Sequence, residues 1–450
     1  MRGDYLEKKI GLIGAVSMLV GAMIGAAVFV LLGPLANQTG PSLPLAFFLG
    51  ALPAFFGSVY YIQLGSMFPS SGGTYVYTSR LLSPTFGVLA AFWMLFAGIG
   101  ASGMLALGFV DYIGFYVGHL PMKSTAILIV IVFVIINLFG IRFSSLLQIY
   151  MVIWMVGALV MYIVFGMFGQ DSSVLISIDN GPFLRNGLSG LLMATVLSFY
   201  SYAGYGLITE IGGEIKQPEK NTPRAIIISL VFVTAIYMGA AYVSTTVIPL
   251  EQFIGFKASL PMTAAFFLPE WAVHAIAIGG LLALFTSLNA MLLIFPHELY
   301  VMAKDRAVST LFLMKLKRFN TPYVSLILVG FITITLIHLG FSGTAFATMT
   351  VAGFLLGSML MGFSALNIFK KANAQYEAAA VRLPKRLLIG FTVLGIFSSF
   401  IFAILAVLEE PLVGIMVIGV GIFGILYSWI YIKDENTRNL DIDEFFHKIE

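Results

Sequence analysis

The stretch GAMIGAAVF, Gly21 to Phe29, lies in the middle of the first long apolar segment of the chain, residues 10–36. This segment is longer than the roughly 20 apolar residues that cross a bilayer as a helix. It nevertheless contains Gly21 and Gly25, and a glycine in a helix interior costs about 1 kcal/mol relative to alanine. Hydrocarbon also offers no water to satisfy freed backbone groups. The stretch therefore indicates either a close helix contact or a helix interrupted within the membrane, and the second alternative requires a matching interruption elsewhere.

The composition is that of a membrane protein. The 450 residues are 59% hydrophobic and only 10% charged, and the mean hydropathy is +0.99. These values are typical of polytopic helical membrane proteins. The absence of cysteine excludes disulfides, thiolate metal sites and cysteine nucleophiles. The small net charge of +3 gives no indication of nucleic-acid binding, and the first apolar run is too long for a cleavable signal peptide.

Twelve apolar segments are predicted to cross the bilayer as helices joined by short connections. Residues 70–84 predict an interfacial helix, and residues 169–187 and 249–271 predict loops. No stretch is long enough for a soluble domain, so residues 1–450 are predicted to form a single transmembrane domain. The segments are residues 10–36, 43–68, 87–110, 122–140, 144–168, 188–210, 225–248, 272–300, 324–340, 343–369, 387–408 and 412–432.

The distribution of Lys and Arg predicts the orientation of the chain. With the N-terminus in the cytoplasm, twelve crossings leave Lys123, Arg185 and Lys257 outside and the other 21 of the 24 Lys and Arg residues inside. A wrong number of segments would destroy this asymmetry. We therefore expect a multi-pass protein of the cell membrane with both termini in the cytoplasm.

A second glycine cluster lies in the sixth segment, within SFYSYAGYGLITE, Ser198 to Glu210. Gly204 and Gly206 are flanked there by Ser and Tyr side chains that can satisfy freed backbone groups. A single cluster of this kind is explained by close packing of small residues between helices. Clusters in both the first and the sixth segments favour an inverted repeat with a binding site near the middle of the membrane.

Two interrupted helices without charged side chains suit a zwitterion. The N–H end of an interrupted helix carries positive partial charge and binds a carboxylate, whereas the carbonyl end binds an ammonium group or a metal cation. An α-amino acid presents both charges a short distance apart. Residues 10–36 and 188–209 contain no Lys, Arg, Asp, Glu or His, so the backbone itself is expected to hold the substrate.

The run SYAGYGLITEIGGEIKQPEKNTPRAI, Ser201 to Ile226, resembles the signature of the amino acid–polyamine–organocation transporters. That signature is a glycine–aromatic break followed by a loop of the type Glu-x-x-x-Pro-x-x-x-x-Pro-x-Ala. Ile24 to Phe29 is similar to the family's IGSGIF motif, with two alanines where Ser-Gly is usual, and Ser70 to Tyr77 is similar to its segment after the second helix. The nearest likeness is to broad-specificity permeases of the ApcT type. The matching loop positions are Glu214, Pro218, Asn221, Pro223, Arg224 and Ala225.

The resemblance implies an all-α fold of the LeuT type, in which two sets of five helices form an inverted repeat. Repeat one would cover about residues 10–168 and repeat two about residues 188–369, with two further helices at about residues 387–432. The first helices of the two repeats would be broken in mid-membrane. The substrate-binding residues that it implies are Gly25, Ala26 and Ala27 around the carboxylate, and Phe199, Tyr200, Tyr202 and Gly204 around the amino group.

The residue at position 206 bears on the substrate. Family members that handle basic amino acids or polyamines tend to carry an acidic residue there, whereas this chain has Gly206. A cationic side chain would lack a neutralising partner, and burying an unpaired charge is costly. We therefore expect a neutral, small or apolar amino acid, transported by alternating access.

The resemblance also implies sites for a coupling ion. In sodium-coupled relatives, two adjacent hydroxyls of the eighth helix join backbone carbonyls around a sodium ion. The alternative is that these hydroxyls bond back to their own helix. The groups in question are the carbonyls of Gly21, Ile24 and Ala283 and the hydroxyls of Thr286 and Ser287.

Proton coupling is a second alternative. Proton-coupled permeases of the ApcT type carry a lysine in the fifth helix, at a position that falls near Met155, and this chain has none there. Ionisable residues within spans are functional candidates by default, so Glu298 and His297, which follow Pro296, are the candidate proton site. The third alternative is exchange or facilitated transport without a coupling ion.

Other classes of function find no support in the sequence. There is no phosphate-binding loop, no His/Glu metal-ligand spacing and no catalytic set, so an enzyme is not expected. We expect no cofactor beyond a coupling sodium ion or proton. The expected partners are an amino acid and membrane lipids, with the chain as a monomer or homodimer. An ion or organic-amine transporter of the same fold remains an alternative function.

Overall fold

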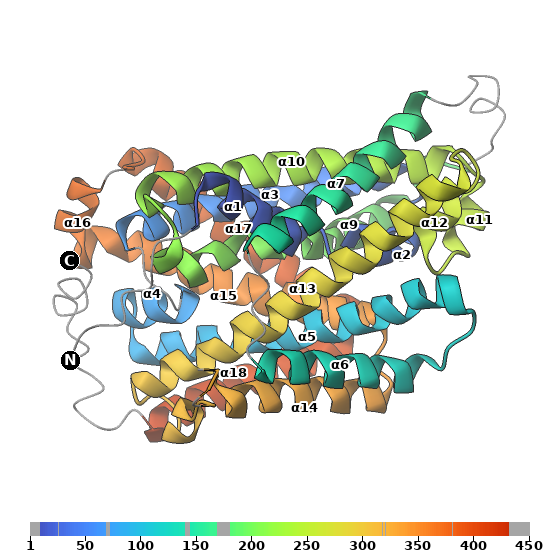
Figure 1. Cartoon of the computed structure of the whole chain (residues 1–450). Coiled ribbons are helices and arrows are strands. Elements are labelled where there is room, and N and C mark those ends of the chain that lie inside the picture. Colours follow the sequence, from blue (N-terminus) through green and yellow to red (C-terminus); the bar gives the residue numbers. More distant parts are fainter. Residues whose placement is uncertain are drawn as a thin grey trace.

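The structure is a computed structural model that describes residues 10–25, 27–68, 73–139, 145–168, 181–316, 318–319, 321–379 and 381–431. Over these residues the chain is helical and contains no β-strand, only two isolated bridges between Ile10 and Ile215 and between Leu316 and Thr321. The long helices run side by side, with α4 and α16 at one end of the bundle and α11 and α12 at the other (Figure 1). This confirms the predicted all-helical fold.

The elements follow one another without a domain boundary. They are α1 (Leu12–Met23), η1 (Ala27–Leu31), α2 (Leu32–Thr39), η2 (Gly40–Ser42), α3 (Leu43–Met67), α4 (Gly73–Leu81), α5 (Pro84–Val117), α6 (Met122–Leu138), α7 (Ser145–Phe168), α9 (Gly187–Ser198), η3 (Phe199–Glu214), α10 (Pro218–Thr246), α11 (Leu250–Ile254), α12 (Ser259–Ala264), α13 (Glu270–Lys304), η4 (Thr310–Leu313), α14 (Tyr323–Leu339), α15 (Gly343–Lys371), α16 (Asn373–Ala378), α17 (Lys385–Glu409) and α18 (Pro411–Tyr431).

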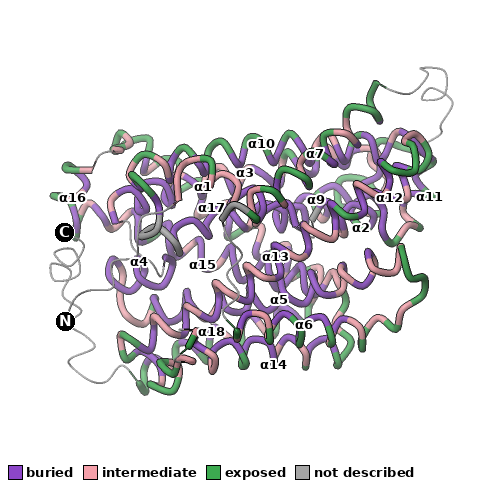
Figure 2. Tube along the Cα trace, viewed as in Figure 1, coloured by how far each residue is buried: buried purple, intermediate pink, exposed green. Residues whose placement is uncertain are grey.

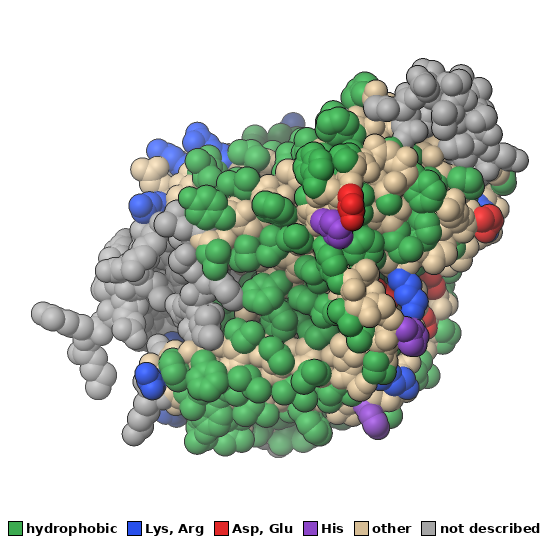
Figure 3. Space-filling view, turned by 45° about the vertical axis from the view of Figure 1, so that its right-hand side comes forward, with side chains coloured by type: hydrophobic (Ala, Val, Ile, Leu, Met, Phe, Trp, Pro, Cys, Tyr) green, Lys and Arg blue, Asp and Glu red, His purple; other side chains and the backbone are tan. Residues whose placement is uncertain are grey.

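Within the described ranges, nine helices are long and apolar enough to cross a membrane, and α6 and α14 are shorter apolar helices. The first of the nine is the run Leu12–Met67, which contains two of the predicted segments. Each of the twelve predicted segments is helical over most of its length. In a space-filling view, hydrophobic side chains cover most of the face between the two ends of the molecule (Figure 3).

Two predicted connections differ from expectation or extend beyond the described residues. The predicted loop at 249–271 contains the short helices α11 and α12, with Pro249 immediately before α11. Most of the predicted loop at 169–187 lies outside the described residues, as do residues 70–72 of the predicted interfacial helix. The described part of that helix forms α4.

The first apolar segment is interrupted where the glycine pattern predicts. α1 ends at Met23, and Ile24 takes a non-helical ψ of 72°. The helix resumes at Ala27 with a π-helical turn and continues as α2.

The sixth segment changes its helix type instead of losing its helix. α9 ends at Ser198, and residues Phe199–Glu214 continue as a 3-10 helix of 16 residues. The change therefore precedes Gly204 and Gly206, where the sequence suggested an interruption. Runs of 3-10 helix beyond three or four residues are uncommon and often mark a hinge or strain.

Helices in the first half of the chain contact their counterparts in the second half. α1 packs on η3, α3 on α10, α5 on α13, and α6 on α14. Other contacts also occur in matching pairs. The contact of α1 with α7 matches that of η3 with α15, and the contact of α1 with α10 matches that of α3 with η3. The contact of α5 with α15 matches that of α7 with α13.

The core lies around α5, which is the most buried of the long apolar helices, whereas α17 and α18 are the least buried (Figure 2). Glycines allow α5 and α15 to approach closely. A Cβ atom at Gly353 would lie 2.5 Å from the carbonyl oxygen of Trp93 and 2.9 Å from the amide nitrogen of Ala97. Because both are backbone atoms, neither can move aside without moving α5.

Substitution of Gly353 by alanine therefore tests this packing. We expect Gly353→Ala to lower the free energy of unfolding by about 1–3 kcal/mol, the usual cost of overpacking a core. Gly419→Ala on α18 is the matched control, because nothing lies within 4 Å of its added Cβ. The measurement is the melting temperature of the purified proteins in one detergent. Equal melting temperatures for the two variants would contradict the close approach of α5 and α15.

Candidate functional site

A small cavity lies between the end of α1, the 3-10 helix η3, and helices α5, α13 and α15. Its free volume is about 30 Å³, which is room for about two water molecules. An amino acid has more non-hydrogen atoms than two waters, so a substrate would have to widen this cavity. It is lined by Ala22, Met23, Gly25, Ala97, Ala101, Leu105, Tyr200, Ala203, Gly204, Leu207, Ser287, Met291, Phe295, Thr350 and Phe354.

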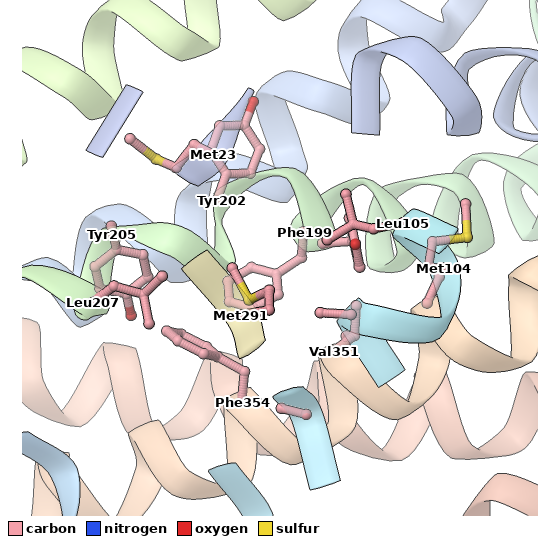
Figure 4. Packing of buried hydrophobic residues seen from close by; sticks show 14 of the residues in the cluster. Met23, Met104, Leu105, Phe199, Tyr202, Tyr205, Leu207, Met291, Val351 and Phe354 are labelled. Atoms are coloured by element: carbon pink, nitrogen blue, oxygen red, sulfur yellow. The ribbon is translucent and has the colours of Figure 1, made fainter. Parts of the chain in front are cut away.

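The lining is mainly apolar. Among the described residues that form it, only Tyr200, Ser287 and Thr350 have polar side chains, and none is charged. The Thr350 hydroxyl donates to the carbonyl of Phe346 on its own helix, at 3.0 Å. Leu207 of η3 and Phe354 of α15 approach each other in this region, and Met291 of α13 lies beside them (Figure 4).

Three of the predicted substrate residues, Gly25, Tyr200 and Gly204, line the cavity. Two others do not. Phe199 is fully buried, with its ring 6.0 Å from that of Phe354. The Tyr202 ring points away from Met291 and Phe354 (Figure 4), and its hydroxyl donates to the Phe47 carbonyl at 3.0 Å.

The remaining predicted residues are Ala26 and Ala27. Ala26 lies outside the described residues, and Ala27 is the first residue of η1. The helix thus restarts at the predicted position, where the first N–H groups have no acceptor within the helix. The amide of Gly25 is engaged, because it donates to the Met23 carbonyl at 2.9 Å.

Gly25 and Gly204 both stand where a side chain would collide. A Cβ atom at Gly25 would lie 2.9 Å from the Cβ of Ser287 on α13. A Cβ atom at Gly204 would lie 3.0 Å from the carbonyl carbon of Ala22 and 3.1 Å from the amide nitrogen of Met23. The glycines of the two predicted clusters thus allow α1, η3 and α13 to meet at the cavity.

Tyr237 on α10 contacts both the end of α1 and the 3-10 helix η3, and it was not predicted from the sequence. Its hydroxyl lies 2.6 Å from the carbonyl oxygen of Met23, the last residue of α1, and 3.3 Å from that of Ser201 in η3. The side chain is fully buried. The only signal in the sequence is a tyrosine inside an apolar segment, whose hydroxyl requires a partner when buried.

The predicted ion ligands form two hydrogen-bonded pairs. The Ser287 hydroxyl donates across to the Gly21 carbonyl at 3.1 Å, so α13 and α1 meet here. The Thr286 hydroxyl donates to the Ala283 carbonyl of its own helix at 3.0 Å, which is the back-bonding that the sequence left open. Ile24 is buried beside this region, directly after the end of α1.

Two side chains of α7 lie next to Gly21 in the ion-ligand region. A Cβ atom at Gly21 would lie 2.9 Å from Cγ2 of Val152, with the Gln148 amide nitrogen at 3.9 Å. Met155, near which the family resemblance placed the lysine, packs instead against Gly279 of α13. The residues of α7 next to Gly21 are therefore Val152 and Gln148.

The two predicted proton-site residues point in different directions, because successive residues lie about 100° apart around a helix. Glu298 is buried, with 2% of its surface exposed. The His297 Nδ1 lies 2.8 Å from the Leu293 carbonyl, and its ring packs edge-on against Tyr300 at 6.4 Å.

A bundle of long apolar helices, with a small cavity where one helix is interrupted and another changes type, is the arrangement expected of a membrane transporter. The sequence profile of the family described as amino acid permease matches residues 10–432. The chain therefore belongs to the amino acid permease family, which confirms the resemblance to the amino acid–polyamine–organocation transporters.

Individual relatives cover most of the chain. An uncharacterized transporter of Mycobacterium tuberculosis is 28% identical over 93% of this chain and 91% of its own. The branched-chain amino acid permease BcaP of Bacillus subtilis is 25% identical over 71% of this chain and 72% of its own. The serine/threonine exchanger SteT of the same species is 27% identical over 71% and 74%, respectively.

The role of Tyr237 is tested by removing its hydroxyl. We expect Tyr237→Phe to lower the free energy of unfolding by about 0.5–1.5 kcal/mol, because the Met23 carbonyl keeps the Gly25 amide as a donor but loses its hydrogen bond from Tyr237. We also expect it to lower amino acid uptake into proteoliposomes. Tyr162→Phe is the matched control, since that buried hydroxyl bonds Ser244 at 2.8 Å, away from the cavity. Equal losses of uptake in both variants would contradict a special role for Tyr237.

Proposed function

We propose that this protein is a secondary transporter that carries neutral amino acids across the cell membrane by alternating access. The observation that carries the proposal is the cavity between α1, η3 and α13, whose described lining has no charged side chain. A charged substrate side chain would be buried there without a partner, at high cost. The family of the chain and its relatives named as permeases support an amino acid as the substrate.

We further propose twelve spans, arranged as two inverted repeats of five helices followed by α17 and α18. The matching pairs of helix contacts support this arrangement: the contact of α1 with α7 matches that of η3 with α15, and the contact of α1 with α10 matches that of α3 with η3. The excess of Lys and Arg in alternate connections supports cytoplasmic termini. The chain would act as a monomer or homodimer.

In the proposed complex the substrate carboxylate approaches the start of η1, with Gly25, Ala26 and Ala27, because amides at a helix start favour an anion. The amino group approaches carbonyls of η3 near Phe199, Tyr200 and Tyr202. The side chain of the substrate faces the apolar lining, including Ala97, Ala101 and Met291. One relative is named for branched-chain amino acids and another for serine and threonine, so both small and apolar substrates are candidates.

Substrate entry requires movement, because the closed cavity has room for about two water molecules. Tyr200 and Phe354 are the large side chains that approach it from η3 and α15. We propose that Tyr200 acts as an aromatic gate. Widening on one side of the cavity while the other side stays closed is the alternating access expected of broken-helix transporters.

Coupling to sodium is the first candidate mechanism, at the carbonyls of Gly21, Ile24 and Ala283 and the hydroxyls of Thr286 and Ser287. These are hard oxygen ligands, the type that small cations prefer. The contact between Ser287 and Gly21 supports their grouping. A proton bound at Glu298 or His297 is the second candidate, and exchange without a coupling ion, the activity named for one relative, is the third.

Substitution of the glycines tests the binding site. We expect Gly25→Leu and Gly204→Leu to lower amino acid uptake at least tenfold, which corresponds to a loss of about 1.4 kcal/mol in binding. Gly157→Leu on α7 is the control, because nothing lies within 4 Å of its added Cβ. Uptake of a panel of labelled amino acids into proteoliposomes measures the effect. Undiminished uptake by a folded Gly25→Leu variant would contradict the site, and preferred uptake of lysine or arginine would contradict a neutral substrate.

Imposed gradients test the coupling ion. If sodium is coupled, uptake by the parent protein rises with an inward sodium gradient, and Thr286→Ala with Ser287→Ala removes that dependence. If a proton is coupled, uptake follows an imposed pH gradient and Glu298→Gln removes the response. Uptake that requires only an amino acid inside the vesicles identifies an exchanger and overturns both coupling proposals.

A further inference from the structure

Two lysines share one tyrosine ring at the end of α13. The Nζ atom of Lys304 lies 4.9 Å from the centre of the Tyr300 ring, and that of Lys315 lies 4.1 Å from the same centre. The two ammonium groups are therefore at most 9.0 Å apart, the sum of these distances. Like charges at this separation repel each other, and an anion between them would turn that repulsion into attraction.

No acidic side chain of the described residues forms an ion pair with Lys304 or Lys315. The nearest in sequence, Asp305, is bound elsewhere: its Oδ2 lies 2.8 Å from Nη2 of Arg80 on α4. Burial holds the pKa of the Tyr75 phenol well above its usual value, and the neighbouring Asp305 charge raises it further. Asp305 thus faces α4 and pairs with Arg80 there, so no carboxylate of the described residues pairs with either lysine.

The chain that follows α13 is apolar on its exposed side. Leu311 is 51% exposed, Leu313 36% and Met314 46%, all within or next to η4. Basic residues continue directly after them, with the Arg318 guanidinium 5.3 Å from the centre of the Phe319 ring. Exposed apolar side chains next to Lys and Arg are typical of segments that lie in the headgroup region of a membrane.

We propose that Lys304, Lys315 and Tyr300 form a binding site for the phosphate of an anionic phospholipid, with its acyl chains against Leu311, Leu313 and Met314. The charge of the site requires an anion, and the apolar side chains next to it favour a lipid over a soluble phosphate. α13 ends here, beside α4, at the left-hand end of the bundle in Figure 1. The inference rests on the proposed orientation, in which this end lies in the cytoplasmic leaflet, where anionic lipids gather.

Native mass spectrometry of the full-length protein in neutral detergent tests the site, with dioleoyl phosphatidylglycerol as the probe and the phosphatidylcholine analogue as the reference. We expect one phosphatidylglycerol to be retained in preference to phosphatidylcholine. Lys304→Ala with Lys315→Ala should weaken its apparent affinity roughly 25-fold, about fivefold for each lysine. Lys315→Gln alone should weaken the apparent affinity for phosphatidylglycerol about fivefold, and it should disturb the fold least.

The matched control is Lys216→Ala with Lys220→Ala, which removes the same charge from two exposed lysines beside the start of α10. An equal loss in this control would show general charge attraction and overturn the site. Soluble glycerol 1-phosphate should fail to displace the lipid, and effective displacement would overturn the role of Leu311, Leu313 and Met314. Because bound lipid is measured directly, these outcomes do not depend on whether the protein transports amino acids.

Discussion

The hydrogen bond from the Tyr237 hydroxyl to the Met23 carbonyl is the contact on which the interrupted first helix depends. In hydrocarbon, a carbonyl freed at a helix end needs a donor from the protein, because no water is available. The Gly25 amide donates to this carbonyl at 2.9 Å, and Tyr237 adds a second donor at 2.6 Å. The same hydroxyl lies 3.3 Å from the Ser201 carbonyl of η3. Its ring is held by Tyr202, 5.6 Å away, and by Phe47, 5.3 Å away. One side chain of α10 thus fixes the end of α1 relative to η3, and with it the wall of the cavity.

The cavity combines a polar backbone with apolar side chains. Gly25 and Gly204 bring the backbones of α1 and η3 together, while Met291 and Phe354 supply apolar surface. Backbone groups have a fixed position and carry only partial charge, so they can meet both ends of a zwitterion without introducing a net charge into the membrane. In the proposed complex, the backbone would bind the part that all amino acids share, and the side chains of the lining would contact the variable part.

The sequence predicted the helical fold and the interruption at Gly25 because both follow from local rules: apolar length, and glycines that weaken a helix in a medium without water. The change from α-helix to 3-10 helix in the sixth segment depends on tertiary contacts, which local sequence rules do not describe. Ser198 donates to the Ala46 carbonyl and Tyr202 to the Phe47 carbonyl of α3, so η3 tightens against α3 before Gly204 is reached. Tyr237 and Val152 were missed for the same reason, since only the packing of α10 and α7 on α1 brings them to the site.

The length of η3 has a mechanical consequence. A 3-10 helix rises about 2.0 Å per residue and an α-helix about 1.5 Å. The 16 residues of η3 therefore hold extra length, about 8 Å in total, relative to an α-helix of the same residues. Its far end is tied to the start of α1, because the Lys216 amide donates to the Ile10 carbonyl at 2.8 Å. Each residue that rewinds into α-helix would draw that junction about 0.5 Å toward the cavity. Contraction of η3 would thereby pull on the N-terminal end of α1.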